Sequence, residues 1–263
     1  MPYHKITSLS ALLCVLIFTS CSTDDDASEP ENHNDKYEPG IVLTFDDTYV
    51  DEWYQADQLM DTYNWKATFF ITKYADFTPE EKQQLHALNN KGHEIAGHGL
   101  NHLKATDYMA QHGLDAYIND EITPMRSIMD ADGFNVRNFA YPYGARNTEL
   151  DTRLLQQFDI IRGTTYGMLL PELQNCYYTG NRLVYGLGID DSYAHSDIEY
   201  FKTLMQYAKE NGKIIIFYGH KTVPNVTGDY QTSYAMLEGI CKYAQDNNLK
   251  FYTISELRNL QPL

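Results

Sequence analysis

Hydrophobic residues follow two alternating patterns from position 40 onward. Short, continuously apolar runs predict buried strands, and longer segments with apolar residues three or four positions apart predict helices. Strands are expected at residues 40–47, 66–72, 93–98, 134–143, 159–165, 213–220 and 249–254, and helices at residues 49–64, 79–91, 114–130, 149–158, 197–211 and 233–247. Repeated strand–helix units predict parallel strands joined by right-handed crossovers, in an open sheet or a barrel.

Two of the helices have recognisable start signals. Thr78 and Glu81 have the spacing of a capping box, and so do Ser196 and Glu199. Residues 166–196 show no clear periodicity, and a long segment of this kind is often a functional loop.

The first 39 residues differ in kind from the rest. Lys5 precedes a short apolar run and then Cys21, a pattern that resembles a bacterial lipoprotein signal. The resemblance implies a signal peptide over residues 1–20 and lipid attachment at Cys21; an ordinary secretory peptide or a disordered N-terminus is the alternative. Residues 21–39 are acidic and polar, which predicts a flexible tether, and residues 40–263 then form a single domain.

The N-terminal 39 residues and the net charge of the chain predict where the protein is located and what it binds. The acidic run at residues 24–26 resembles a tag that directs some Gram-negative lipoproteins to the cell surface, so we expect an extracytoplasmic protein anchored to the outer membrane by its lipid. A formal net charge of −16 argues against binding nucleic acid and favours a neutral or cationic substrate. Cys176 and Cys241 either pair or remain buried thiols, and nothing indicates an oligomer.

Polar residues gather at the carboxyl ends of the predicted strands, where a barrel carries its catalytic groups. Asp46 and Asp47 end the first strand, His98 the third, and His220 a later one. Adjacent carboxylates repel, so they call for a metal, a basic group or a shared proton, although a helix cap is the simpler alternative. One carboxylate with two imidazoles suits a divalent ion, and a helical turn after the strand would bring His98 and His102 together. No glycine-rich loop follows the first strand, which weakens a nucleotide-binding sheet.

Four motifs together resemble those of the polysaccharide deacetylase family, also called NodB-homology domains or family-four carbohydrate esterases. They are Thr-Phe-Asp-Asp at residues 44–47, His-x-x-x-His at 98–102, Pro-Tyr-Gly at 142–144, and an apolar strand that ends in histidine at 214–220. The resemblance implies an α/β fold, a distorted (β/α)7 barrel as a single catalytic domain over residues 40–263. It also implies metal-dependent removal of N-acetyl or O-acetyl groups from an acetylated carbohydrate.

The resemblance also implies roles for individual residues. Three would bind the metal, most simply zinc, with cobalt, nickel or iron as alternatives. These three metal ligands are Asp47, His98 and His102. Asp46 would act as general base, His220 as general acid, and the Tyr143 N–H as oxyanion donor. The candidate substrate contacts are Tyr49, Tyr141 and Pro142.

One departure from the family pattern concerns the partner of the general base. The family places an arginine two residues before the proline of the third motif, and this chain has Ala140 there. Arg137, Arg146 and Arg182 are the candidates to supply the guanidinium from elsewhere.

A second departure concerns the partner of the general acid. The Asp-x-x-x-Trp motif that would orient His220 is not found, and Asp190 or Asp191 is the candidate replacement. The two departures motivate an alternative function, a catalytically weak or inactive carbohydrate-binding surface lipoprotein on the same fold.

Overall fold

The computed structural model describes Met1 and residues 36–263. The chain divides into two units, Met1–Asn32 and His33–Leu263, and the second contains all of the described helices and strands. Cys21 and, apart from Met1, the predicted signal peptide lie outside the described residues, as does the predicted tether up to residue 35. Every helix in the described part of the chain is too short or too polar to serve as a membrane span.

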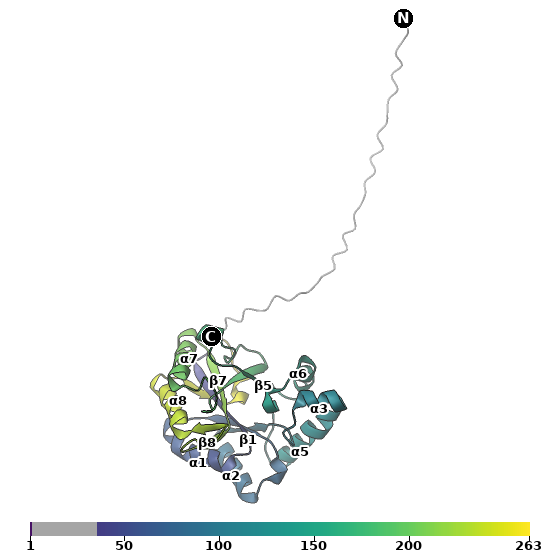
Figure 1. Ribbon diagram of the computed structural model, residues 1–263, viewed down its shortest axis with the longest axis horizontal. Helices are drawn as coiled ribbons and strands as arrows, with labels where there is room; N and C mark the ends of the chain where they lie inside the picture. The colour runs from purple at the N-terminus through teal and green to yellow at the C-terminus, as the bar shows by residue number, and fades with distance from the viewer. Residues whose placement is uncertain (2–35) are drawn as a thin grey trace. The chain divides into compact units, whose positions relative to one another are not determined.

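Seven parallel strands close into a barrel (Figure 1). Around the barrel they are β1 (Gly40–Asp47), β2 (Ala67–Ile71), β3 (Glu94–Gly97), β4 (Asn138–Ala140), β5 (Ile160–Thr165), β6 (Leu183–Gly188) and β7 (Ile214–Gly219). β7 pairs with β1 from Gly40 opposite Ile214 to Phe45 opposite Gly219, and this pairing closes the ring. The predicted α/β class and (β/α)7 barrel are confirmed.

The barrel is distorted in two places. One edge of β1 is shared, because its first residues pair with β10 (Lys250–Tyr252) and its last five pair with β2. Between β3 and β4, a single register pair joins Gly97 to Phe139. The ladder between β3 and β4 is therefore the shortest in the ring.

Helices surround the barrel (Figure 1). They are α1 (Val50–Met60), α2 (Pro79–Asn90), α3 (Ala105–His112), α4 (Leu114–Tyr117), α5 (Thr123–Ala131), α6 (Thr148–Leu154), α7 (Ile198–Asn211), α8 (Tyr234–Asp246) and α9 (Ile254–Leu257). A π-helical segment, η3 (Ile118–Ile122), joins α4 to α5, and short 3-10 turns span Asp61–Tyr63, Tyr74–Asp76, Pro142–Gly144 and Pro171–Leu173. Two further short strands, β8 (Lys221–Val223) and β9 (Gln231–Ser233), pair with each other.

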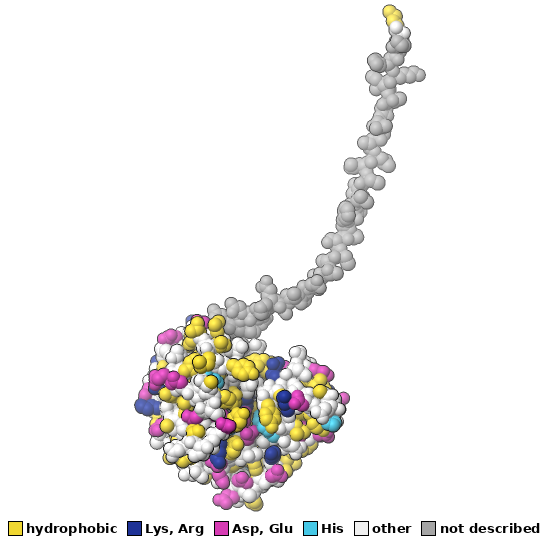
Figure 2. All heavy atoms as spheres, viewed as in Figure 1, with side chains coloured by type: hydrophobic (Ala, Val, Ile, Leu, Met, Phe, Trp, Pro, Cys, Tyr) yellow, Lys and Arg dark blue, Asp and Glu magenta, His cyan; other side chains and the backbone are white. Residues whose placement is uncertain are grey.

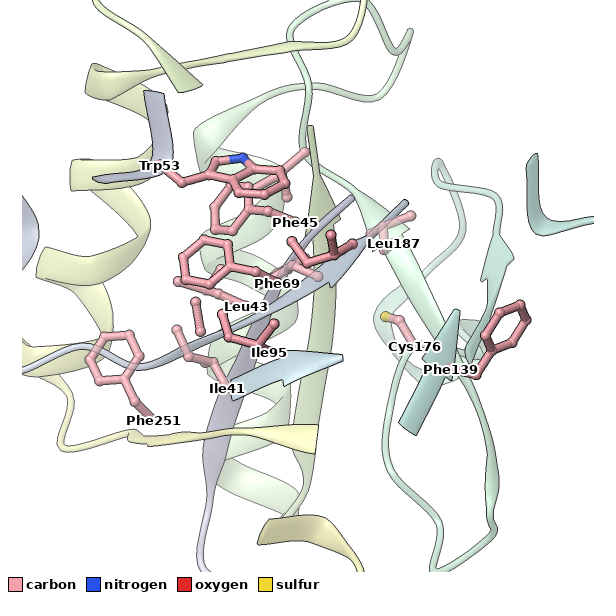
Figure 3. Packing of buried hydrophobic residues seen from close by; sticks show 14 of the residues in the cluster. Ile41, Leu43, Phe45, Trp53, Phe69, Ile95, Phe139, Cys176, Leu187 and Phe251 are labelled. Carbon is pink, nitrogen blue, oxygen red and sulfur yellow. The ribbon is translucent and has the colours of Figure 1, made fainter. Parts of the chain in front are cut away.

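Alternation along β1 decides what its last residues face. Ile41, Leu43 and Phe45 pack in the cluster between the strands and the helices (Figure 3). Val42 belongs to the second cluster, inside the barrel, with Phe70 and Ala140. Because side chains alternate along a strand, Asp46 shares the interior face with Val42. A run that is apolar on both faces therefore ends with a carboxylate inside the barrel.

The local signals in the sequence have mixed outcomes. Thr78 and Glu81 form the predicted capping box at the start of α2. The expected box of Ser196 and Glu199 is wrong, since the side chain of Asp197 caps α7 by accepting the Glu199 N–H. α7 begins at Ile198, whereas a capping box of Ser196 and Glu199 requires a helix that begins at residue 197, so Asp197 is the N-cap residue.

Strand β6 lies inside the segment that showed no periodicity. It contains Gly186 and Gly188, and glycine is rare in strands, which hides the pattern. Packing favours glycine at both positions, more strongly at Gly188. A Cβ on Gly186 would lie 3.2 Å from Arg162 Cδ, and one on Gly188 would lie 2.4 Å from the Tyr193 ring.

Glu94 ties together the end of the barrel opposite the carboxyl ends of the strands. One carboxylate oxygen accepts hydrogen bonds from Thr68 Oγ1 (2.9 Å) and the Ser255 N–H (2.8 Å), and the other from Ser255 Oγ (2.7 Å) and Asn138 Nδ2. These bonds connect β2, β3, β4 and α9.

The two remaining cysteines do not form a disulfide. Cys176 and Cys241 are both free and fully buried. Burial raises the pKa of the Cys176 thiol to about 12, so it stays protonated. Of the two possibilities that the sequence left open, buried thiols are the correct one.

Candidate active site

The polar residues predicted at the strand ends line one pocket. It has a volume of about 280 Å³ and is lined by Asp46, Asp47, His98, His102, Tyr143, Gly144, Thr164, Tyr193, Tyr218, His220 and Tyr230. Figure 2 shows this face hollowed near its centre, with histidine and hydrophobic side chains along the hollow. The pocket lies at the carboxyl ends of the parallel strands, as expected for a barrel of this type.

Asp47, His98 and His102 bring three potential ligand atoms together. Asp47 Oδ1 lies 3.1 Å from His102 Nε2 and 3.6 Å from His98 Nε2, and the three ligand atoms all lie within 4.8 Å of one another. His98 Nδ1 is 2.8 Å from the Ala140 carbonyl, which fixes the proton on that nitrogen and leaves Nε2 with a free lone pair.

Two observations show that this set fits a divalent cation. Asp46 Oδ1 and Asp47 Oδ1 are buried and accept no hydrogen bond in the described part of the chain, although a buried polar atom normally has a partner. The protonation states also suit a cation. Burial alone would raise the pKa of Asp47. The hydrogen bond with His102 and the charges of His98, His220 and His102 have the larger effect, and they lower this pKa to about 2. Burial lowers the pKa of His98 to about 4, so its ring is neutral at pH 7.

The expected helical turn between His98 and His102 is wrong. The segment is a loop in which Gly99 has φ +84° and His102 has φ +61°. These left-handed residues reverse the chain, and the two rings still lie 5.0 Å apart. Asp47, at φ +91°, is turned toward them from the end of β1.

Asp46 forms an ion pair with Arg162, a fully buried residue of β5. The arginines expected from the sequence are wrong: Arg137 pairs with Asp159, Arg146 with Asp151, and Arg182 with backbone carbonyls. Arg162 was missed because it lies within an apolar strand, where a charged residue is rare.

The register of the barrel explains how Arg162 takes this role. Ala140 and Arg162 are directly paired neighbours on β4 and β5. Paired residues of parallel strands project to the same face, so Arg162 fills the space beside Ala140 inside the barrel. Its guanidinium lies over the rings of Phe70 (5.3 Å) and Tyr218 (5.0 Å).

His220 is held by Asp190, one of the two acids predicted for this role. His220 Nδ1 lies 2.6 Å from Asp190 Oδ2, and the His220 N–H donates to Asp190 Oδ1 at 3.1 Å. Thr232 also donates to Asp190 Oδ1, at 2.7 Å. Burial lowers the pKa of His220, but the hydrogen bond and charge of Asp190 outweigh it, and the net pKa is raised.

Comparison with known proteins agrees with this arrangement. Residues 33–159 match the family model described as polysaccharide deacetylase. Over these residues the chain matches the polysaccharide deacetylase family. Comparison with curated proteins found no significant match.

Solved structures of this family share the fold at low sequence identity. The Xyl-CE4 domain of a multidomain xylanase, from the hindgut metagenome of Trinervitermes trinervoides, is 22% identical with a TM-score of 0.53 and covers 84% of this chain and 89% of its own. The catalytic domain of a peptidoglycan N-acetylglucosamine deacetylase from Eubacterium rectale is 20% identical with a TM-score of 0.53, covering 87% and 96%. A family 4 acetyl xylan esterase from Clostridium thermocellum, in complex with a cobalt ion, is 20% identical with a TM-score of 0.53, covering 82% and 89%.

Tyr143, which lies within the matched residues, reaches the pocket. It has φ +59° and is 68% exposed, its ring lies 4.6 Å from that of His102, and its N–H donates to no acceptor in the described residues. Gly144 follows at φ +64°, where a Cβ would lie 2.3 Å from Thr164 Oγ1, so only glycine fits.

The other predicted substrate contacts do not line the pocket. Tyr141 is buried and donates to Asp151 Oδ1 at 3.0 Å, on the outer side of the barrel. Pro142 is also buried, and Tyr49 packs edge-on against Trp53. In their place the pocket has Tyr193, Tyr218 and Tyr230. Tyr218 lies within the fourth motif, whereas Tyr193 and Tyr230 lie outside the motifs and only the high tyrosine content pointed to them.

We predict that the ion pair of Asp46 can be moved between strands. Arg162→Ala leaves a buried carboxylate without its counter-charge, and we expect the free energy of unfolding to fall by about 3–5 kcal/mol. Adding Ala140→Arg returns the guanidinium from the neighbouring strand at the same total volume, and should recover most of the loss in chemical denaturation. If the double variant is no more stable than Arg162→Ala, the contribution of Arg162 is its packing on Phe70 and Tyr218.

Proposed function

We propose that this chain is a metal-dependent hydrolase that removes N-acetyl or O-acetyl groups from a carbohydrate. The observation that carries the proposal is the placement of a carboxylate–imidazole triad, a second carboxylate and a third imidazole around one pocket. The family match supports acetyl-group hydrolysis in general, and the metal and substrate are part of the proposal.

Asp47, His98 and His102 would hold the metal, most simply zinc. A bound divalent ion would supply Lewis-acid activation of water and of the acyl oxygen. Asp47 and His98 lie at the ends of β1 and β3, so the barrel sets their spacing, and His102 lies in the loop that follows β3.

Asp46 is the proposed general base. Arg162 occupies one of its carboxylate oxygens, and the other, Oδ1, is buried without a donor. That free oxygen is available to accept a proton from water in the pocket. Because Arg162 is buried and its guanidinium packs on two aromatic rings, it holds the carboxylate in one orientation.

His220 is the proposed general acid. Asp190 binds its Nδ1, so Nε2 is the nitrogen that can carry a proton to the leaving group. The N–H of Tyr143 would donate to the acyl oxygen as negative charge develops there.

Two exposed tyrosines support a carbohydrate as the substrate. Tyr143 packs against His102, and Tyr230, which is 54% exposed, packs against His220 with ring centroids 5.3 Å apart. Aromatic faces of this kind stack on sugar rings. The structural neighbours include both a peptidoglycan N-acetylglucosamine deacetylase and an acetyl xylan esterase, so both linkages belong to the proposal.

The inactive alternative loses its main support. It was motivated by a missing arginine and a missing acid, and Arg162 and Asp190 occupy those two functions. Asp46 and His220 therefore each have the charged partner that the proposed chemistry requires.

We predict acetate release from at least one of chitooligosaccharides, peptidoglycan fragments and acetylxylan. Chelator should abolish release and added zinc or cobalt should restore it, and Asp47→Ala should behave like the chelated protein. The substrate that reacts identifies the linkage. Stoichiometric metal binding with no release from any of the three would favour the carbohydrate-binding alternative.

We predict that Asp190 sets the alkaline limit of activity. A general acid must be protonated, so activity falls as the pH rises through the pKa of His220. Asp190→Asn removes the interaction that raises this pKa, and the alkaline limb of kcat/KM should therefore move to lower pH. Asp191→Asn changes the adjacent, exposed carboxylate and serves as the control. An alkaline limb that stays in place in Asp190→Asn would contradict the role of His220 as the acid.

Anchoring to the outer membrane through Cys21 is also part of the proposal. It is supported by the lipoprotein-like signal alone. Mass spectrometry of the mature N-terminus should find Cys21 as the first residue, carrying lipid, and Cys21→Ser should release the protein from membranes. A mature protein that begins at another residue would contradict lipidation.

A further inference from the structure

Glu121 differs from the other buried carboxylates. It is fully buried, in the π-helical segment η3, and no Lys, Arg or His lies within ion-pair distance of it in the described part of the chain. Each of the others has a cationic partner: Asp46 has Arg162, Asp57 has Lys91 and His93, Asp151 has Arg146, and Asp190 has His220. A buried charge is costly unless something compensates it, so Glu121 requires an explanation.

The Glu121 side chain makes both of its hydrogen bonds in the described residues to the segment between His98 and His102. Its Oε2 accepts the Asn101 N–H at 3.0 Å, and its Oε1 accepts Asn101 Nδ2 at 2.6 Å. Its backbone carbonyl accepts the Leu100 N–H at 3.2 Å. Both the side chain and the main chain of Glu121 therefore hold this loop.

The loop depends on such support. It has no regular structure, and it needs left-handed conformations at Gly99 and His102. A Cβ at position 99 would lie 3.1 Å from Glu121 Oε2, so the carboxylate lies directly against the turn. On the other side, the Leu100 carbonyl accepts the Lys73 N–H at 3.0 Å.

The π-helical segment places Glu121 at this point. Pro124 has no N–H and cannot donate to the carbonyl of Asp120, which disturbs the α-helical ladder just after η3. π-Helical turns occur often at functional sites because they redirect side chains. Here the turn directs a carboxylate toward the loop that carries two candidate metal ligands.

We propose that Glu121 is a positioning residue for metal binding. It fixes the loop so that His98 and His102 face Asp47. The inference rests on the proposed function, because it assumes that Asp47, His98 and His102 hold a metal. Outer partners of metal ligands commonly contribute 10- to 100-fold to affinity.

The test measures the affinity of the full-length protein for Zn²⁺ and Co²⁺ by calorimetry, and the visible absorption of the Co²⁺ form. Glu121→Gln keeps the shape of the side chain but replaces one carboxylate oxygen, a hydrogen-bond acceptor, with an NH₂ group that would face the NH₂ group of Asn101. We expect its metal affinity to fall at least 10-fold and the Co²⁺ spectrum to change.

A second variant reverses the polarity of the same contact. In Glu121→Gln with Asn101→Asp, the new amide can donate to the new carboxylate, so the hydrogen bond is restored with its direction reversed and the total charge is kept. We expect the double variant to recover most of the lost affinity. A residue that only stabilised the fold would not show this rescue in metal affinity.

Glu94→Gln is the matched control, since it alters a carboxylate with several hydrogen bonds at the opposite end of the barrel. It should lower the melting temperature without weakening metal binding. Wild-type affinity in Glu121→Gln, or no recovery in the double variant, would overturn the inference while leaving the proposed function intact. If the wild-type protein binds neither ion, the proposed metal site and this inference both fail.

Discussion

The repulsion between two adjacent carboxylates at the end of β1 is the constraint on which the site depends. Asp46 and Asp47 are neighbours in the chain, and both are largely removed from water, so each needs its own compensation. Strand alternation sends Asp46 into the barrel, where Arg162 meets it. A positive φ turns Asp47 away, toward His98 and His102. The two acids thereby acquire different partners and different chemistry, one beside a fixed cation and one in a site suited to an exchangeable one.

The same logic extends outward from the pocket. Three parts of the proposed site are each held by a buried residue from another element: Asp46 by Arg162, His220 by Asp190, and the loop of His98 and His102 by Glu121. Asp190 is held in turn by Thr232, on the short strand β9. Arg162, Asp190 and Glu121 are three of the six Asp, Glu and Arg residues that are buried in the described part of the chain. The interior of the barrel, which an apolar strand pattern would leave neutral, is therefore electrostatically organised around the pocket.

Sequence reasoning reached the fold because the barrel strands are short apolar runs separated by well-marked helices. It reached Asp46, Asp47, His98, His102, Tyr143 and His220 because each directly follows such a run or belongs to a short motif. It missed β6, whose glycines make room for Arg162 and Tyr193, and it placed the wrong arginines beside Asp46. Contacts of this kind depend on register between strands far apart in the sequence. Tyr141 shows the opposite error. It was predicted to contact substrate because it is next to the Pro-Tyr-Gly motif, but side chains alternate along the strand and its ring points out of the pocket.

Register also bears on how a departure from a family motif should be interpreted. Ala140 stands where the resemblance led us to expect arginine, and Arg162 is its paired neighbour on the next strand. Since paired residues of parallel strands share a face, a guanidinium can change strands while its charge stays beside the same carboxylate. A missing motif residue is therefore weak evidence for lost chemistry until the neighbouring strand has been considered. In this barrel the departure changes which strand carries the arginine, and Asp46 keeps its counter-charge.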